Sequence, residues 1–229
     1  MISAVAAAGF RLGKAGKARE AARRSEETAS GAVRAEAAIE DVLWPDLSKY
    51  ELSGEVLSVS GGCAAVTGVS GTMQSVRGEQ CAGVVFMKRE NGRFVITGSR
   101  TFPRSRELIT CACIDPDNQR YILVMRSETD GIRASAVCGT AEEISSGREL
   151  TSELNIHYGM GVKGCISGGI LYLCTDRLVL AYDAATAAYL CGTVLPQPVR
   201  NIYSTPEGAF AETGNTGAAL KLRSSFTED

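Results

Sequence analysis

Some residue types are scarce in this chain, and their scarcity excludes certain classes of site. The 229 residues include one histidine, His157, and one tryptophan, Trp44, while aromatic residues make up only 6%. A single imidazole excludes metal centres built on several histidines, and no CxxC pair occurs for a typical structural zinc site. No apolar run approaches the roughly 20 residues that a membrane-spanning helix needs. We therefore expect neither a structural zinc site nor a membrane span.

The charges are nearly balanced, with 24 lysines and arginines against 26 acidic residues and a formal net charge of -2. Such a chain has no global attraction to nucleic acid or to an anionic membrane surface. We therefore do not expect nucleic acid as a partner, unless a local basic cluster binds it.

The front of the chain is predicted to be a helical arm. Residues 15–43 are rich in alanine, glutamate and arginine and contain no proline, and Trp44 and Pro45 end the pattern. The apolar stripe of this helix consists mostly of small side chains that bury little area, so we expect the helix to need a partner. The predicted domains are an arm over residues 1–45 and a β-rich head over residues 46–229.

Basic residues dominate the first half of this arm, which is the reverse of the order that the helix dipole favours. A binding surface would explain this order, and a solvated face without a partner is the alternative. The predicted partner-binding residues are Arg11, Lys14, Lys17, Arg19, Arg23 and Arg24.

The localisation is left open by the sequence. The apolar start has no basic residue before it, unlike a standard secretory signal. The absence of an acidic residue before Glu20 fits a mitochondrial transit peptide, which is the main alternative to an arm that stays on the protein.

After Trp44 the sequence changes to short runs of β-forming residues separated by turn signals. The 25 glycines and frequent valine, serine and threonine favour short strands over a helix bundle. Two such runs that flank a turn signal predict a hairpin. The turn signals lie at residues 61–62, 89–92, 115–119, 168–169, 184–186 and 206–208.

Residues 139–161 interrupt this series of hairpins. Their glycine and serine content is high and their apolar periodicity is poor, although a helical turn or two would fit. We interpret the segment as a surface excursion between strands.

Eight cysteines are spread among small or apolar neighbours in predicted strands, and we expect them to be buried free thiols. An oxidised framework is the alternative, because eight is an even number. Cys165, Cys174 and Cys191 are expected on separate strands of one sheet, as core residues.

Two stretches resemble β-propeller repeats. ITCACIDPDNQRYILVMRS, with a small-residue strand and the turn Asp115 to Gln119, resembles the first hairpin of a WD-repeat blade. GGILYLCTDRLVLAYDAATAAYLC resembles a quinoprotein blade through the turn from Tyr182 to Thr186. The resemblance covers residues 81–223, and the hairpins from Tyr50 onward count as about five short units.

The resemblance implies a mainly β fold of antiparallel hairpin repeats. The predicted fold is a small or incomplete β-propeller-like head with an N-terminal α-helical arm, and a β-sandwich or barrel is the alternative. Propellers carry function in their loops and faces, so the resemblance implies a protein-binding platform.

No group of residues supports a catalytic mechanism. Residues 159–164 match GxGxxG, but a β-type run follows where a phosphate site needs a helix N-terminus. The close carboxylate pairs, Asp115 with Asp117 and Glu142 with Glu143, fit a turn and a solvated charged run. We therefore predict no catalytic residue, cofactor or metal.

The first hypothesis for function is a non-catalytic structural subunit of a larger assembly. It would dock through its arm onto other subunits, copies of itself included, and virions and phage tails are assemblies that use such parts. The second hypothesis is a ligand-binding or enzymatic propeller with a site near His157. The third is a nucleic-acid binder that uses the basic arm.

Overall fold

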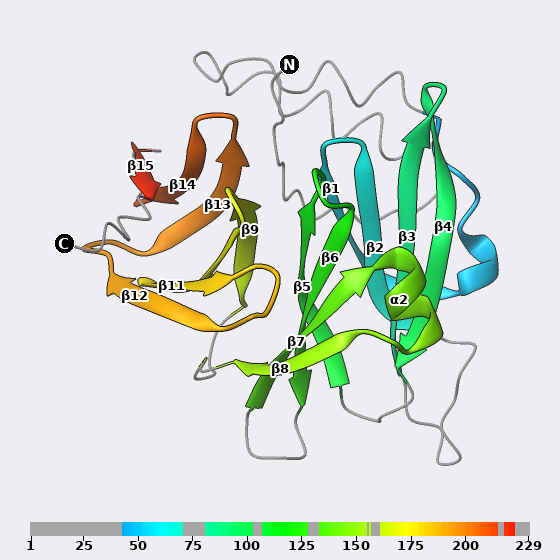
Figure 1. Ribbon diagram of the computed structural model, residues 1–229, viewed down its shortest axis with the longest axis horizontal. Helices are drawn as coiled ribbons and strands as arrows, with labels where there is room; N and C mark the ends of the chain where they lie inside the picture. Colours follow the sequence, from blue (N-terminus) through cyan, green and yellow to red (C-terminus); the bar gives the residue numbers. More distant parts are fainter. Residues whose placement is uncertain are drawn as a thin grey trace.

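The computed structural model describes residues 43–70, 81–102, 107–127, 133–154, 156, 161–214 and 218–222. Within these ranges the chain is mainly β, and its strands form four antiparallel sheets. The sheets are arranged like the blades of a small β-propeller (Figure 1). We call them blades 1 to 4 in chain order, and they confirm the predicted fold class.

Each blade is a meander of consecutive strands. Blade 1 contains β1 (Leu52–Ser60), β2 (Cys63–Ser70), β3 (Cys81–Glu90) and β4 (Arg93–Phe102). Blade 2 contains β5 (Glu107–Asp115), β6 (Arg120–Ser127), β7 (Arg133–Thr140) and β8 (Leu150–Leu154). Blade 3 contains β9 (Lys163–Ser167), β10 (Ile170–Thr175), β11 (Leu178–Asp183) and β12 (Tyr189–Val194). Blade 4 contains, within the described residues, β13 (Val199–Thr205), β14 (Gly208–Thr213) and β15 (Ala218–Leu222).

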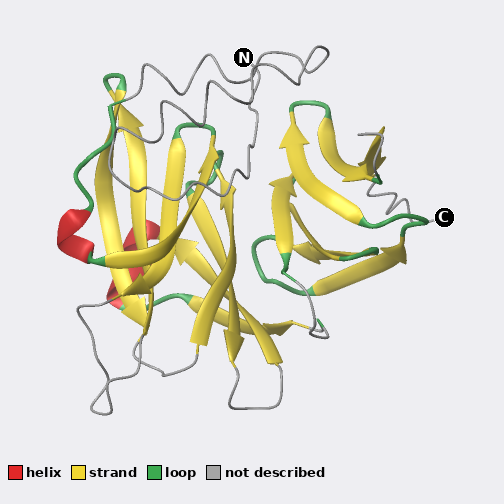
Figure 2. Ribbon diagram, turned by 180° about the vertical axis from the view of Figure 1, so that it is seen from behind, coloured by secondary structure: helices red, strands yellow, loops and turns green. Residues whose placement is uncertain are grey.

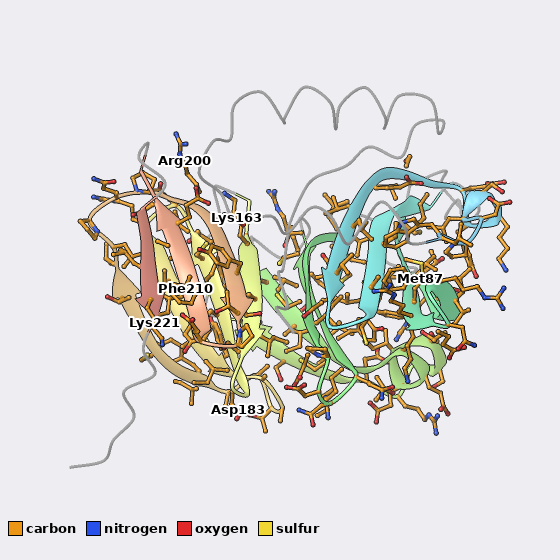
Figure 3. All side chains as sticks on the ribbon, turned by 90° about the horizontal axis from the view of Figure 1, so that it is seen from above. Met87, Lys163, Asp183, Arg200, Phe210 and Lys221 are labelled. Carbon is orange, nitrogen blue, oxygen red and sulfur yellow. The ribbon has the colours of Figure 1, made fainter. Side chains whose placement is uncertain are left out.

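The first strands of consecutive blades pack on one another. β5 contacts β1, β9 contacts β5, and β13 contacts β9. At the join of blades 3 and 4, the Lys163 Nζ donates to the backbone oxygen of Arg200, and the two residues lie side by side in Figure 3. The last strands of the blades, β4, β8, β12 and β15, therefore lie at the outer edges, as Figure 2 shows from behind.

The predicted turns join the strands that they were expected to join. Asn91 and Gly92 both adopt left-handed φ angles, of 49° and 79°, between β3 and β4. Asparagine and glycine tolerate this region better than other residues, which is why this pair marks a tight hairpin. Between β5 and β6, the Asn118 side chain donates to the Asp115 carboxylate at 2.8 Å. The interpretation of Asp115 as a turn residue is thus confirmed.

Buried side chains form a separate core between each two consecutive blades. The alternation along β6 illustrates how one strand serves two cores, because successive side chains of a strand point to opposite faces. Ile122 and Val124 face the core shared with blade 3, while Tyr121, Leu123 and Met125 face the core shared with blade 1. Among the described residues, the joins between blades 1 and 2, 2 and 3, and 3 and 4 are therefore mainly apolar sheet-on-sheet interfaces.

The outer face of blade 1 has its own cover. The indole of Trp44 stacks on Phe94 with ring centroids 4.4 Å apart, and the Phe94 N–H donates to the backbone oxygen of Leu43 at 2.9 Å. Leu47, which precedes the 3-10 helix η2 (Ser48–Tyr50), and Tyr50, which ends it, pack on the same face. The predicted arm, residues 1–45, lies almost wholly outside the described residues.

The interpretation of residues 139–161 as a surface excursion is wrong for most of its described part. A six-residue helix, α2 (Ala141–Ser146), begins at a capping box in which the Glu143 N–H donates to the Thr140 side chain at 3.2 Å. The Thr140 N–H donates in return to the Glu143 carboxylate at 2.8 Å, which lowers the pKa of that carboxyl. β8 follows and completes blade 2, so Glu143 caps a helix and is not merely part of a solvated charged run.

The number of repeat units also needs correction. The hairpin count gave about five units, whereas the described residues form four sheets. The blades begin at Leu52, Glu107, Lys163 and Val199, which are 55, 56 and 36 residues apart. The second interval matches the first because blade 2 includes α2 and β8, which the hairpin count left out.

Candidate interaction surface

The outer edge of blade 3 is an exposed and largely apolar strand. All six residues of β12 are exposed, and Tyr189, Leu190 and Val194 keep 53%, 36% and 66% of their surface. An edge strand presents unpaired backbone N–H and C=O groups that another strand can bind. β12 therefore combines free backbone groups with apolar side chains, which is the combination that strand addition uses.

The inner side of β12 is firmly paired with β11. The register places Thr193 opposite Val179 and Cys191 opposite Ala181, and the Leu195 N–H donates to the Arg177 oxygen at 2.8 Å. Antiparallel pairs alternate between hydrogen-bonded and non-hydrogen-bonded residues. The backbone groups of Cys191 and Thr193 therefore point toward β11, and those of Gly192 and Val194 point outward.

The start of β12 is fixed by the turn that precedes it. The Asp183 carboxylate accepts hydrogen bonds from the Thr186 side chain at 2.7 Å and from two backbone N–H groups, of Thr186 and Ala185. These bonds, with the Thr186 side chain as the largest cause, lower the pKa of Asp183. Figure 3 places Asp183 at the rim of blade 3. The Asp183 side chain therefore stabilises the turn that leads into β12.

Gly192 lets the strand pack closely on its own blade. A Cβ at this position would lie 2.7 Å from a Leu180 methyl carbon and 3.2 Å from the Tyr189 hydroxyl. The Tyr189 ring makes an edge contact with Tyr182 at 5.7 Å. The centre of the exposed edge therefore has no side chain, which is a feature of strands that another backbone approaches closely.

The outer strands of the other blades carry charged residues that oppose pairing with another chain, and β12 carries none. Charged side chains on edge strands discourage pairing with other chains. Charged residues occur on β4 (Arg93 and Arg100), β8 (Glu153) and β15 (Lys221), whereas residues 184–199 around β12 contain none. β12 does have a bulge at Leu190 and is followed by prolines 196 and 198, which limit the free edge to a few residues.

The residues predicted to bind a partner or ligand lie elsewhere in the chain. Arg11, Lys14, Lys17, Arg19, Arg23 and Arg24 are outside the described residues, and so is His157. The segment from Gly161 to Gly164 leads into strand β9, so the second half of the GxGxxG match opens a strand as expected.

All eight cysteines are free, and six of them are buried. Burial raises the pKa of Cys138 and of Cys174 to about 11 each, and it also raises the pKa of Cys165. Thiols that stay protonated are poor nucleophiles, so these cysteines pack as small apolar side chains.

The prediction of buried free thiols is confirmed for the six buried cysteines, but it is wrong for Cys191, which is exposed on β12. Cys111 is half-buried, with its sulfur 3.6 Å from that of Cys113.

One surface pocket, of about 530 Å³, lies where β4 meets α2. Of the two cationic side chains in its lining, Lys49 and Arg100, the second contacts the Glu149 carboxylate at 2.5 Å and donates to the Ile144 oxygen at 2.9 Å. The lining includes no histidine, cysteine or carboxylate. The hydrogen bond from Arg100 to Ile144 thus holds α2 against blade 1.

Two further kinds of feature do not occur in the part of the chain that the structure describes. No three histidine, cysteine or acidic side chains are grouped there in a way that would hold a metal ion. No described helix has the length and apolar character to cross a membrane.

No family model matches the chain, and no curated protein matches it. The fold and its exposed edge are therefore the basis for any functional argument.

Proposed function

We propose that the protein is a non-catalytic interaction subunit of a larger assembly. The observation that carries this proposal is the exposed edge of β12. Apolar side chains and outward backbone groups there are unprotected by charge, while the outer strands of the other blades carry charged residues. A protein that only had to stay monomeric would gain from a lysine on this strand, because charged edges oppose association.

The propeller-like fold supports the same function. Blades packed through apolar cores present rigid edges and rims, and proteins that add a strand to a sheet edge use main-chain hydrogen bonds for affinity and side-chain pockets for specificity. The described pocket adds no chemistry that competes with this function, because Arg100 is engaged by Glu149.

The more specific hypotheses stay predictions. They comprise docking through the basic arm, membership of a virion or phage tail, and a β-propeller of WD or quinoprotein type. The ligand site near His157 and the binding of nucleic acid by the arm likewise depend on residues outside the described ranges.

Size-exclusion chromatography of extracts from the native source tests the proposal. We expect the wild-type chain to elute at an apparent mass far above its own 24.2 kDa. Replacing Val194 with lysine should shift it to lower mass, because a charge on the exposed edge opposes strand pairing. The control is Leu150→Lys, which alters a side chain of similar exposure, 57%, on β8. Elution of the wild type at the mass of one chain would refute the proposal.

A further inference from the structure

We infer that β12 binds the β12 strand of a second copy of this chain, antiparallel, about a twofold axis at Gly192. This inference rests on the proposed function, because it names the partner of the same edge. The two strands would continue blade 3 of one copy into blade 3 of the other.

The side chains around Gly192 are symmetric in size. Reading outward from it, the sequence has Cys191 and Thr193, which are small, and then Leu190 and Val194, which are large and apolar. An antiparallel dyad at Gly192 places Cys191 opposite the second copy's Thr193, and Leu190 opposite its Val194. Small residues thus meet small ones and large residues meet large ones, so the segment is complementary to itself.

The direction of the backbone groups agrees with this register. Gly192 directs its N–H and C=O outward, since its neighbours on either side are the residues bonded to β11. Two copies of Gly192 on the dyad would exchange two hydrogen bonds. Cys191 and Thr193 would then form the closer, non-hydrogen-bonded pair, whose Cα atoms lie about 4.5 Å apart.

The absence of charge favours a second copy as the partner. A twofold pairing brings each residue near its own counterpart, so a strand that carries one sign of charge repels itself. β12 is the blade edge without a charged residue, and Lys221 would face such repulsion on β15. The pairing of one short strand buries less than the roughly 1,200 Å² of a standard stable interface, so the dimer should depend on concentration.

A disulfide trap tests the register with the purified full chain. In Thr193→Cys, the introduced thiol would lie opposite Cys191 of the second copy, within the Cα separation that disulfides require. For each disulfide formed, one oxidised glutathione would be reduced to two molecules of reduced glutathione, which take up the two electrons and two protons that the two thiols lose. We expect a covalent dimer from Thr193→Cys on a non-reducing gel. The wild type should give little, because its two Cys191 residues would be diagonal neighbours about 7–8 Å apart. Leu150→Cys, on the exposed β8, is the control that should stay monomeric.

A charge exchange tests the same contact without covalent chemistry. Val194→Lys and Leu190→Glu should each weaken the dimer about tenfold in sedimentation equilibrium, because each places a charge against an apolar residue across the dyad. The double variant Leu190→Glu with Val194→Lys would instead form two opposite-charge pairs across the dyad and should recover most of the affinity. Circular dichroism of each variant confirms that the fold is intact.

The outcomes separate this inference from the proposed function. The wild type could form a covalent dimer directly through Cys191, with no further dimer from Thr193→Cys. That result would place the twofold axis away from Gly192 and overturn the inference. A purified chain that stays monomeric and uncross-linked would overturn it as well. A large mass in native extracts would in that case still support an interaction subunit with a different partner at this edge.

Discussion

The backbone of Gly164 on β9 lies directly against the Cys113 sulfur on β5. A Cβ on Gly164 would sit 2.7 Å from that sulfur and 2.6 Å from a methyl carbon of Leu173. Such distances are too short for real contacts, so the glycine allows the first strands of blades 2 and 3 to approach. The junction of blade 2 with blade 3 therefore depends on the absence of a side chain at Gly164.

We expect Gly164→Ala to lower the free energy of unfolding by about 1–3 kcal/mol, which is the usual cost of overpacking a core. The measurement is urea denaturation followed by circular dichroism. Gly161→Ala is the matched control, because nothing lies within 4 Å of its added Cβ. Equal stability of the two variants would show that the junction of β5 and β9 accommodates an added methyl group without loss of free energy.

The helix cap at Thr140 gives a second test of stability. Thr140→Ala removes the side-chain acceptor for the Glu143 N–H, and loss of such a cap costs about 1 kcal/mol. Thr140→Ser keeps a hydroxyl and should retain most of that stability. Thermal denaturation compares the three proteins, and a Thr140→Ala variant as stable as the wild type would mean that α2 does not need its cap.

Cys191 should be the one fast-reacting thiol. It is exposed, whereas Cys63, Cys81, Cys113, Cys138, Cys165 and Cys174 are buried and Cys111 is half-buried. Reaction of the native protein with Ellman's reagent at pH 8 should therefore show about one rapid equivalent, as expected from the dependence of thiol reactivity on access. Cys191→Ser should remove the rapid phase, and Cys174→Ser should leave it unchanged. Several rapid equivalents in the native protein would contradict the burial of the other thiols.

The local turns and strands could be predicted from the sequence because their signals are local. Asn91-Gly92 and Gly168-Gly169 set tight hairpins wherever they occur, and the runs beside them alternate or are apolar throughout. The capping box from Thr140 to Glu143 was also local and readable as T-x-x-E, yet the glycine-rich context obscured it. β8 is only five residues long, and its pairing with β7 is decided by the sheet rather than by its own composition.

The candidate surface could not be predicted, because exposure is a property of the assembled blade. Cys165, Cys174 and Cys191 have similar apolar neighbours in the sequence, and all three lie on blade 3 as expected. Cys174 is buried because β10 lies inside the sheet, and Cys165 is buried because β9, at the inner edge, packs on β5 and β13. Cys191 is exposed because β12 is the outer edge. The absence of charge over residues 184–199 can be seen in the sequence. It indicates an interaction surface only once β12 is known to be the outer strand of blade 3.

Burial of the thiols should make the protein less stable in alkali. The pKa of Cys138 and of Cys174 is raised from 9.0 to about 11 by burial. Below pH 9 both folded and unfolded chains keep these thiols protonated, so their contribution is fully present. Between pH 9 and 11 the unfolded chain loses the protons and the folded chain does not, so stability falls by about 1.4 kcal/mol per pKa unit at most for each thiol. Urea midpoints from pH 8 to 11 should therefore decline more steeply for the wild type than for Cys138→Ala with Cys174→Ala, and parallel curves would refute the assignment.

Asp183 should have the opposite effect, in acid. Its pKa is lowered below 3.8 by the Thr186 side chain and by backbone N–H groups, so the folded state favours the ionised carboxylate. The stabilisation is then fully present above pH 3.8 and is lost as the pH falls through the lower folded pKa.

Asp183→Ala removes the acceptor of these bonds and should cost about 1 kcal/mol near neutral pH, on the scale of a net hydrogen bond. Asp183→Asn keeps an acceptor oxygen without the charge, so it should be intermediate at pH 7. Its difference from the wild type should shrink as the pH falls from 5 toward 2.5. Because this turn leads directly into β12, Asp183→Ala should also weaken the dimer in sedimentation equilibrium, whereas Thr140→Ala, at the N-cap of α2 in blade 2, should not.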